Sequence, residues 1–226
     1  MQTVSCIIPA YNEGPRIRGV LSAVHRHPLI SETIVVDDGS HDDTASVVRQ
    51  FPDIRLVTHE RNRGKSQAVV TGIRHAHGEF LFFLDADLLG VTPEAISALI
   101  EPVVSGQADI SISLRKNAPW LWRIIGIDCI SGERVLHRNL VARRLDEIGR
   151  LTSYALESYL NKLIVKNQCR IKIVPWNNVV SPWPQKKWGL LSGTLAFLRM
   201  LANIFKVMSL FEICYLTFKM RSLRVA

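Results

Sequence analysis

The chain has 226 residues, of which 47% are hydrophobic and 21% charged, and its formal net charge is +8 at pH 7. This apolar content excludes a disordered chain, and the length fits one globular domain with room for an appendage. The four cysteines show no metal-binding spacing and follow no secretory signal, so we expect a reducing cytoplasm. The basic balance favours an anionic partner, which could be a phosphorylated substrate, a membrane surface or nucleic acid.

Short β-branched runs alternate with stretches of helical periodicity along the first half of the chain. We expect strands over residues 4–10, 33–36, 54–58, 80–84 and 109–114, and helices over 15–25, 43–51, 66–75 and 93–104. Ser40 or Asp42 would begin the second helix, and Thr92 followed by Pro93 would begin the fourth. This alternation predicts an α/β fold, with a mostly parallel sheet covered by helices on both faces.

The apolar run at residues 80–84 is followed at once by Asp85-Ala86-Asp87. Because strand side chains alternate between faces, the two carboxylates are expected to point the same way from the strand end. Two neighbouring anions repel each other unless a cation lies between them, and carboxylate oxygens suit Mg²⁺ or Mn²⁺. A solvated loop after a strand is the alternative interpretation of this motif taken alone.

Two further polar clusters follow predicted strands, at Pro9-Ala10-Tyr11-Asn12-Glu13-Gly14 and at Asp37-Asp38-Gly39-Ser40. Ligands of open α/β sheets bind outside the carboxyl ends of the strands, so three loops would bring carboxylates to one edge. Gly39 allows a positive φ or a close backbone approach, and Asp38 can accept hydrogen bonds from a nucleobase or ribose. Turn and helix-cap chemistry explains Asp37 and Ser40 equally well.

These segments, together with Asn62-Arg63-Gly64-Lys65, resemble the family 2 glycosyltransferases of GT-A (Rossmann-like) fold in residue types, order and spacing. The resemblance runs from about residue 4 to 114 and more loosely to about 180. It implies a nucleotide-diphospho-sugar donor, with the Asp-x-Asp motif binding ribose and Mg²⁺ or Mn²⁺ on the diphosphate. Asp87 would be the main metal ligand, and Asp85 would contact both ribose and metal. It also implies a nucleoside pocket with Lys65 nearby, lined by Pro9, Tyr11, Glu13 and Asp38.

The same resemblance implies inversion at the anomeric carbon with one general base, which is normally a carboxylate. The acids that follow the Asp-x-Asp motif in the acceptor half are Asp128, Glu133, Asp146, Glu147 and Glu157. We select Glu157 because its helix-like segment resembles the helix that carries acceptor-side acids in relatives, although a helical Glu is often solvated. Asp128 is the second choice.

Ser131-Gly132-Glu133-Arg134 resembles the acceptor-side Ser-Gly-x-Arg segment of lipid-directed members of the family, in which Arg134 could clamp a phosphate. The alternative is a flexible Gly turn with charged surface pairs. Some relatives supply a third metal ligand from a His near residues 179–182, but here no His follows His137. The seven histidines are expected to be surface or packing residues.

The chain changes character from Trp183 onward, where aromatic and basic residues are mixed and Glu212 is the only acid. Charged residues interrupt every window of the ~20 apolar residues that a spanning helix needs. We therefore expect a catalytic domain over 1–182 and basic amphipathic helices over 183–226 that lie in the membrane interface. A lid packed on the domain, or a dimer interface, is the alternative. No nucleic acid partner is expected, because the basic residues form no polar stripe.

Together these patterns predict an inverting, metal-dependent glycosyltransferase, peripheral on the cytoplasmic face of the membrane, with a lipid-linked or polyprenyl-phosphate acceptor. Two alternatives stay open, a soluble enzyme acting on a small phosphorylated or saccharide acceptor and a non-catalytic nucleotide-sugar-binding protein. The sugar, the nucleotide base and the oligomeric state do not follow from the sequence.

Overall fold

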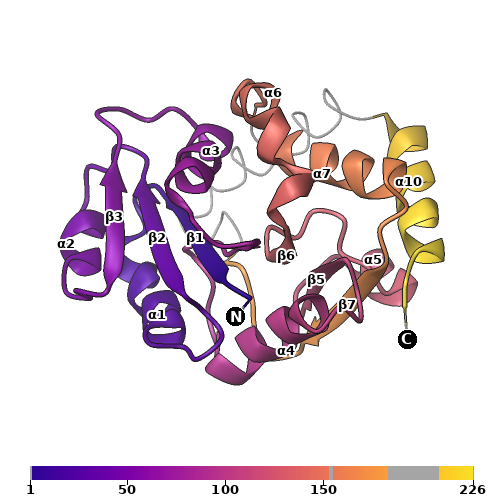
Figure 1. Ribbon diagram of the computed structural model, residues 1–226, viewed down its shortest axis with the longest axis horizontal. Helices are drawn as coiled ribbons and strands as arrows, with labels where there is room; N and C mark the ends of the chain where they lie inside the picture. Colours follow the sequence, from indigo (N-terminus) through magenta and orange to yellow (C-terminus); the bar gives the residue numbers. More distant parts are fainter. Residues whose placement is uncertain (1, 153–154, 183–208, 226) are drawn as a thin grey trace.

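A computed structural model describes residues 2–152, 155–182 and 209–225 of the chain. Its centre is a seven-stranded sheet of order β3-β2-β1-β4-β6-β5-β7 with helices on both faces (Figure 1). The pairs β3–β2, β2–β1, β1–β4 and β5–β7 are parallel, whereas β6 runs antiparallel to both of its neighbours. The predicted α/β class, with a mostly parallel sheet, is confirmed.

The elements follow one another as strand and helix through the first half of the chain. The strands are β1 (Val4–Ala10), β2 (Glu32–Asp37), β3 (Ile54–Thr58), β4 (Phe80–Phe83), β5 (Ile110–Arg115), β6 (Arg134–His137) and β7 (Ile171–Trp176). The helices are α1 (Gly14–Val24), α2 (Thr44–Val48), α3 (Lys65–His75), α4 (Pro93–Val104), α5 (Trp120–Ile125), α6 (Leu145–Gly149), α7 (Ala155–Lys166) and α10 (Leu210–Ser222). Two short 3₁₀ helices, η1 (Arg138–Leu140) and η2 (Ala142–Arg144), connect β6 to α6.

The nine elements predicted in the first half are all present, and β1, β3 and α4 have the expected bounds. Thr92 begins α4 as expected, because its side chain accepts a hydrogen bond from the amide of Ala95. The second helix, which was predicted over 43–51, covers only Thr44–Val48 in the structure. Strands β6 and β7 were not predicted. β6 has four residues and begins with an arginine, and β7 carries Pro175, which an edge strand tolerates.

The core lies on the two faces of the sheet. On one face, α1 and α4 pack Ile17, Leu21 and Leu99 against Ile8 and Phe82. On the other face, the buried apolar side chains of α3, α6 and α7 pack against the sheet; they include Val69, Ile73, Ile148, Leu156 and Leu160. The central strands β1 and β4 are almost fully buried because helices cover both of their faces, whereas the edge strand β3 exposes Arg55 and Thr58.

The antiparallel strand β6 decides what reaches the edge of the sheet. Arg134, its first residue, pairs with Phe83 at the end of β4 and with Ile112 in β5. The segment before β6, with Gly132, therefore arrives at the carboxyl ends of the parallel strands. This is the edge at which Asp85 follows β4.

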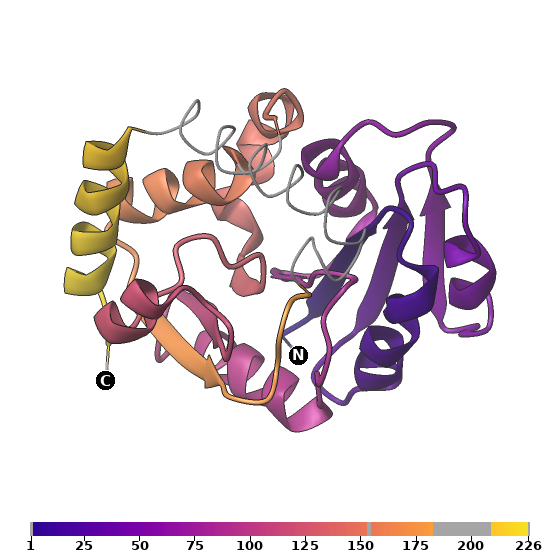
Figure 2. The same ribbon diagram turned by 180° about the vertical axis from the view of Figure 1, so that it is seen from behind.

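The described part of the C-terminal segment is α10, which packs on α7 with Leu216, Thr217 and Met220 buried. Lys162 of α7 pairs with Glu212 at 2.7 Å, and Arg224 forms a β-bridge with Ile171. Figures 1 and 2 both place α10 at the end of the molecule opposite β3 and α2. The predicted boundary at residue 183 and the aromatic and basic residues of 183–208 lie outside the described residues. Among the described helices, none has the length and apolarity to cross a bilayer.

Candidate active site

The first two polar loops are hydrogen-bonded to each other at the sheet edge. The amide of Asn12 donates to Ser40 Oγ at 2.9 Å, and the amide of His41 donates back to Asn12 Oδ1 at 2.9 Å. Gly39 has φ of +73°, and a Cβ there would lie 2.6 Å from the backbone of Arg61. Both reasons for a glycine at this turn are therefore present. Asp37 accepts from the amide of Ser40 at 3.0 Å, which is the turn chemistry weighed for these two residues.

Asp38 is 3% exposed, and its carboxylate holds the loop that leads into α3. It accepts from the amides of Arg63 at 2.9 Å and Gly64 at 2.7 Å, and it contacts His59 Nδ1 at 2.6 Å. His59 Nε2 lies 2.9 Å from Thr71 Oγ1 in α3. Asp38 thus positions the residues immediately before Lys65, in addition to any role at a nucleoside.

The other predicted pocket residues differ in exposure. Tyr11 is 40% exposed, and Glu13 contacts the guanidinium of Arg16 at 2.6 Å through its carboxylate. Pro9 lines a small cavity between the sheet edge and α7, together with Lys65, Asp85 and Glu157. The structure therefore gathers the predicted donor-side residues around the carboxyl ends of β1, β2 and β4.

Lys65 joins the donor side to the acceptor side. Its Nζ lies 2.8 Å from Asp85 Oδ1 and 2.8 Å from Glu157 Oε1, although Lys65 and Glu157 are 92 positions apart. Burial by itself lowers the pKa of Lys65, but the two carboxylates outweigh it and raise the pKa above its usual range. One ammonium therefore bridges two carboxylates from different elements and offsets part of their charge.

The cavity between these side chains has a volume of about 10 Å³ and is also lined by Gly132 and Arg134. Arg134 Nε and Glu157 Oε2 are buried and have no hydrogen-bond partner among the described residues. Two residues that line this space thus carry a donor and an acceptor without a partner, and the space is large enough for one oxygen-sized group.

Gly132 is needed because of Asp85. A Cβ built on Gly132 would lie 2.6 Å from Asp85 Oδ2, so a larger residue would displace the carboxylate from its position. The acceptor-side segment therefore touches the Asp-x-Asp motif directly.

The burial of Arg134 excludes one of the two interpretations given for it, the flexible turn at the surface. It is fully buried, with Nη1 donating to Asn161 Oδ1 at 3.1 Å and Nη2 donating to the carbonyl of Ser131. Burial lowers its pKa, against the opposing attraction of Glu157. A flexible turn with surface pairs is wrong, and a bidentate phosphate clamp would need both terminal nitrogens to leave these protein acceptors.

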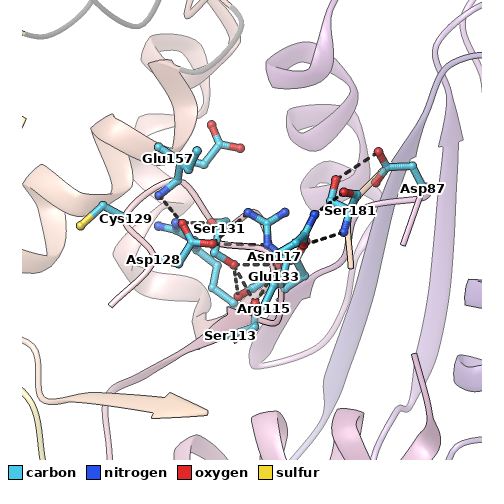
Figure 3. Close-up of polar contacts among 12 residues, drawn as sticks. Asp87, Ser113, Arg115, Asn117, Asp128, Cys129, Ser131, Glu133, Glu157 and Ser181 are labelled. Carbon is cyan, nitrogen blue, oxygen red and sulfur yellow. Dashed lines mark hydrogen bonds and ion pairs between the residues drawn. The ribbon is translucent and has the colours of Figure 1, made fainter. Parts of the chain in front are cut away.

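Asp128 and Glu133 belong to a buried ion network on Arg115, which Ser131 connects to Arg134 (Figure 3). Asp128 is fully buried and lies 2.9 Å from Arg115 Nη2, while Glu133 Oε2 lies 3.6 Å from Arg115 Nε. Ser113 and Ser131 donate to the same Glu133 oxygen at 2.8 and 2.7 Å. Asp128 therefore lies outside the cavity at Glu157, held by a guanidinium. Asp146 and Glu147 are exposed, so Glu157 alone of the five acids lines the cavity.

Asp87 lies beside the segment after β7. Its Oδ2 accepts from Ser181 Oγ at 3.4 Å, and Asn117 Nδ2 holds the carbonyl of Ser181 at 2.7 Å (Figure 3). Residues 179–182 thus reach Asp87 as the resemblance implies, with a serine hydroxyl in the region where some relatives supply a histidine. In the described part of the chain, no group of three or more His, Cys, Asp or Glu side chains forms a metal site. The oxygens of Asp85, Asp87 and Ser181 are nevertheless the donor type that Mg²⁺ and Mn²⁺ take, with diphosphate oxygens and water completing the shell.

Several residues of the site were not identified from the sequence. His59, Arg115, Asn161 and Ser181 form their contacts with residues far along the chain, and no local motif marks them. Arg115 and Asn161 meet their partners only in the folded protein, in the buried region around Glu133 and Arg134.

Comparisons with known proteins identify the family of the chain. The model of the glycosyl transferase family 2 matches residues 5–128. The chain is 30% identical over 189 residues to a dolichyl-phosphate beta-glucosyltransferase of Dictyostelium discoideum, covering 75% of this chain and 53% of that protein. It is 32% identical to an undecaprenyl-phosphate 4-deoxy-4-formamido-L-arabinose transferase of Aeromonas hydrophila, over 54% of this chain and 40% of that one.

Among solved structures, the chain resembles glucosyl-3-phosphoglycerate synthase of Mycobacterium tuberculosis, solved in complex with Mn²⁺, uridine diphosphate and glucosyl-3-phosphoglycerate. The TM-score is 0.66 at 22% identity, over 90% of this chain and 80% of that one, which shows a shared fold. The chain spans about half or less of the length of the curated relatives it matches first. Because the family model covers more than half of the chain, the protein belongs to glycosyltransferase family 2.

Proposed function

We propose that the protein transfers a sugar from a nucleotide-diphospho-sugar to a polyprenyl phosphate or a lipid-linked saccharide, with inversion, at the cytoplasmic membrane face. The observation that carries this proposal is the Lys65 bridge, in which one ammonium contacts both Asp85 and Glu157. The names of the relatives support the acceptor class, since they act on dolichyl phosphate and undecaprenyl phosphate.

In the proposed reaction an acceptor oxygen attacks the anomeric carbon from the face opposite the diphosphate. The new carbon–oxygen bond forms as the bond to the β-phosphate oxygen breaks, and the nucleoside diphosphate leaves with the bonding electrons. Glu157 takes the proton when the acceptor is a hydroxyl, and no base is needed for an ionised phosphate. A hydroxyl both donates and accepts, so it suits a cavity lined by Glu157 and Arg134, whose Oε2 and Nε have no partner among the described residues.

Asp87 and Asp85 would hold Mg²⁺ or Mn²⁺, with the Ser181 hydroxyl beside Asp87. When bound, such an ion neutralises charge on the departing diphosphate. Lys65 stays with Asp85 and Glu157 and keeps the two carboxylates from repelling each other.

Donor and metal binding can be tested without turnover. Calorimetry of a panel of nucleoside diphosphates, with and without Mn²⁺, should show binding that depends on the metal. Asp87→Asn should weaken Mn²⁺ binding at least tenfold, about 1.4 kcal/mol, because it removes a charged ligand. Glu147→Gln, an exposed acid outside the cavity, is the matched control. Full turnover of the wild type in EDTA would contradict metal dependence.

The base and the acceptor class can be tested together by single-turnover kinetics. Glu157→Gln should slow transfer to a hydroxyl acceptor by ~10²–10⁴ and leave transfer to an ionised polyprenyl phosphate nearly unchanged. An undiminished rate with both acceptors would remove Glu157 from the chemistry. Turnover with small phosphorylated acceptors alone would favour the soluble alternative, and nucleotide-sugar binding without transfer to any acceptor would favour a binding protein.

A further inference from the structure

Five large apolar side chains are exposed on two helices at one end of the molecule. Trp120 and Ile124 of α5 are each 72% exposed, and on α10 the exposed fractions are 81% for Phe211, 47% for Tyr215 and 71% for Phe218. Contiguous exposed apolar patches are rare on monomeric proteins and mark interaction sites. We call these five residues the lateral face.

The two helices present the lateral face as stripes. Trp120 and Ile124 are four residues apart, and Phe211, Tyr215 and Phe218 follow the i, i+4, i+7 spacing of one helix side. The opposite side of α10 is buried through Leu216, Thr217 and Met220. The exposed aromatic stripe is therefore not the side that α10 uses to pack on the domain.

Although they are distant in sequence, α5 and α10 are neighbours in space. A Cβ on Gly126, the residue after α5, would lie 2.7 Å from Arg224 Nη1, just beyond α10. Cys129 Sγ lies 3.3 Å from Thr217 Oγ1 of α10. Figures 1 and 2 both show the two helices at the same end of the molecule.

The charges around the lateral face are positive. Arg123, Lys219, Arg221 and Arg224 are exposed, and Lys219 Nζ lies 5.9 Å from the ring centroid of Tyr215. Glu212 is the only acid in the two helices, and it pairs with Lys162. Aromatic residues at the headgroup level and basic residues nearby are what an anionic bilayer surface binds. A symmetric contact between two copies would bring these positive charges together instead.

We propose that the lateral face, formed by α5 and α10 together, docks on an anionic lipid bilayer. This inference rests on the proposed function and names the surface through which the protein reaches a lipid acceptor. The face lies directly behind the acceptor-side segment, because the carbonyl of Cys129 accepts from Asn161 Nδ2 at 2.7 Å and Asn161 holds Arg134. The nucleotide end, with β3 and α2, points away from the membrane.

Removing the C-terminal segment would be an ambiguous test, because α10 also covers apolar core through Leu216 and Met220. Point variants of exposed residues avoid this problem. Flotation of the full chain with vesicles of phosphatidylcholine and phosphatidylglycerol should show binding of the wild type. Trp120→Ala with Ile124→Ala should lower the partition coefficient at least about tenfold, because two apolar side chains that insert into the bilayer are lost.

Charge is tested by a second, matched pair. Arg123→Ala with Arg221→Ala should weaken binding about tenfold or more at low salt. Arg49→Ala with Arg55→Ala removes the same charge from exposed positions at the nucleotide end and should float as the wild type does. Unfolding midpoints of all variants should match the wild type, because the replaced side chains are exposed.

The outcomes separate this proposal from the proposed function. Without vesicles, the Trp120→Ala, Ile124→Ala variant should keep wild-type activity on a short-chain, water-soluble isoprenyl phosphate. If the wild type itself has no activity on this acceptor, the proposed function is refuted and the docking result still stands. If the Trp120→Ala, Ile124→Ala variant floats as much as the wild type, α5 is not part of the docking surface. A wild type that does not float, or that forms a dimer which the α5 pair dissociates, would overturn the bilayer as occupant.

Discussion

Three aspartates in the nucleotide-side loops and three acids in the acceptor half differ in their main partners. The three aspartates accept hydrogen bonds from main-chain amides. Asp37 accepts from Ser40, Asp38 from Arg63 and Gly64, and Asp42 from Gly14 and Thr44. Asp128, Glu133 and Glu157 instead face buried or half-buried cations, Arg115 and Lys65. The first arrangement fixes loop shape, and the second balances charge.

This difference also decides where ionisation is perturbed. Burial raises the pKa of Glu133 despite the nearby Arg115, while Glu133 and Asp128 raise the pKa of Arg115 against its own burial. Removing a partner should therefore have its largest cost in the acceptor half, where a charge would be left buried and unbalanced.

Arg115→Ala should show the largest effect. It leaves the fully buried Asp128 and Glu133 without their shared cation, so the free energy of unfolding should fall by about 3–5 kcal/mol. Urea unfolding measures this loss. Arg55→Ala, at an exposed position on β3, should change stability by less than about 0.5 kcal/mol. A loss below about 1 kcal/mol for Arg115→Ala would be no larger than that of a surface ion pair. It would mean that water reaches these acids.

Lys65→Met should come next, and its effect should be on activity. Without the ammonium, Asp85 and Glu157 repel each other, so kcat/KM should fall about 10²-fold, equivalent to about 2.7 kcal/mol. Lys65→Arg retains the charge and should recover part of kcat. Equal losses in both variants would show that the shape of the lysine, and not its charge, matters.

Asp38→Ala tests the nucleotide side. The amides of Arg63 and Gly64 lose their acceptor, which should cost about 1–3 kcal/mol of stability and loosen the start of α3. The dissociation constant of the donor should rise before that of the acceptor. Calorimetry with a nucleoside diphosphate measures this, with the exposed Asp53→Ala as control. Unchanged nucleotide binding would refute the assignment of Asp38 to the donor side.

Asp109→Asn, in an exposed ion pair, should have the smallest effect. Asp109 lies 2.9 Å from Arg170 Nη2, and both side chains are about half exposed, so the loss should be ~0.2–1 kcal/mol. Hydrogen bonding from Arg170 lowers the pKa of Asp109. The wild-type advantage should therefore be complete above the ordinary Asp pKa of about 3.9 and vanish as pH falls through the lowered value. An advantage that persists at still lower pH would have another origin.

The sequence was most informative where structure is local. Strands 4–10 and 54–58 and the helix at 93–104 were predicted to the residue, because apolar runs, Pro93 and Thr92 carry their own signals. The Asp-x-Asp loop was also placed correctly, after β4 at the sheet edge.

The acceptor half depended on contacts that no window of sequence contains. The burial of Glu133 and Arg134 was not predicted, because charged residues next to a glycine usually lie at a surface. Their burial depends on Ser113, Arg115 and Asn161, from β5 and α7. The link between Lys65 and Glu157 likewise exists only in the folded chain.

The antiparallel placement of β6 has a consequence for how this protein can change. Residues 116–133 leave the sheet at the end of β5 and return to its neighbour β6 at the same edge, so they form an excursion with both ends fixed. Doubling the length of such a loop costs only about 0.6 kcal/mol in closure entropy. Insertions at its exposed positions, near Trp120 and Ile124, would leave the loops that follow β1, β2 and β4 unaltered.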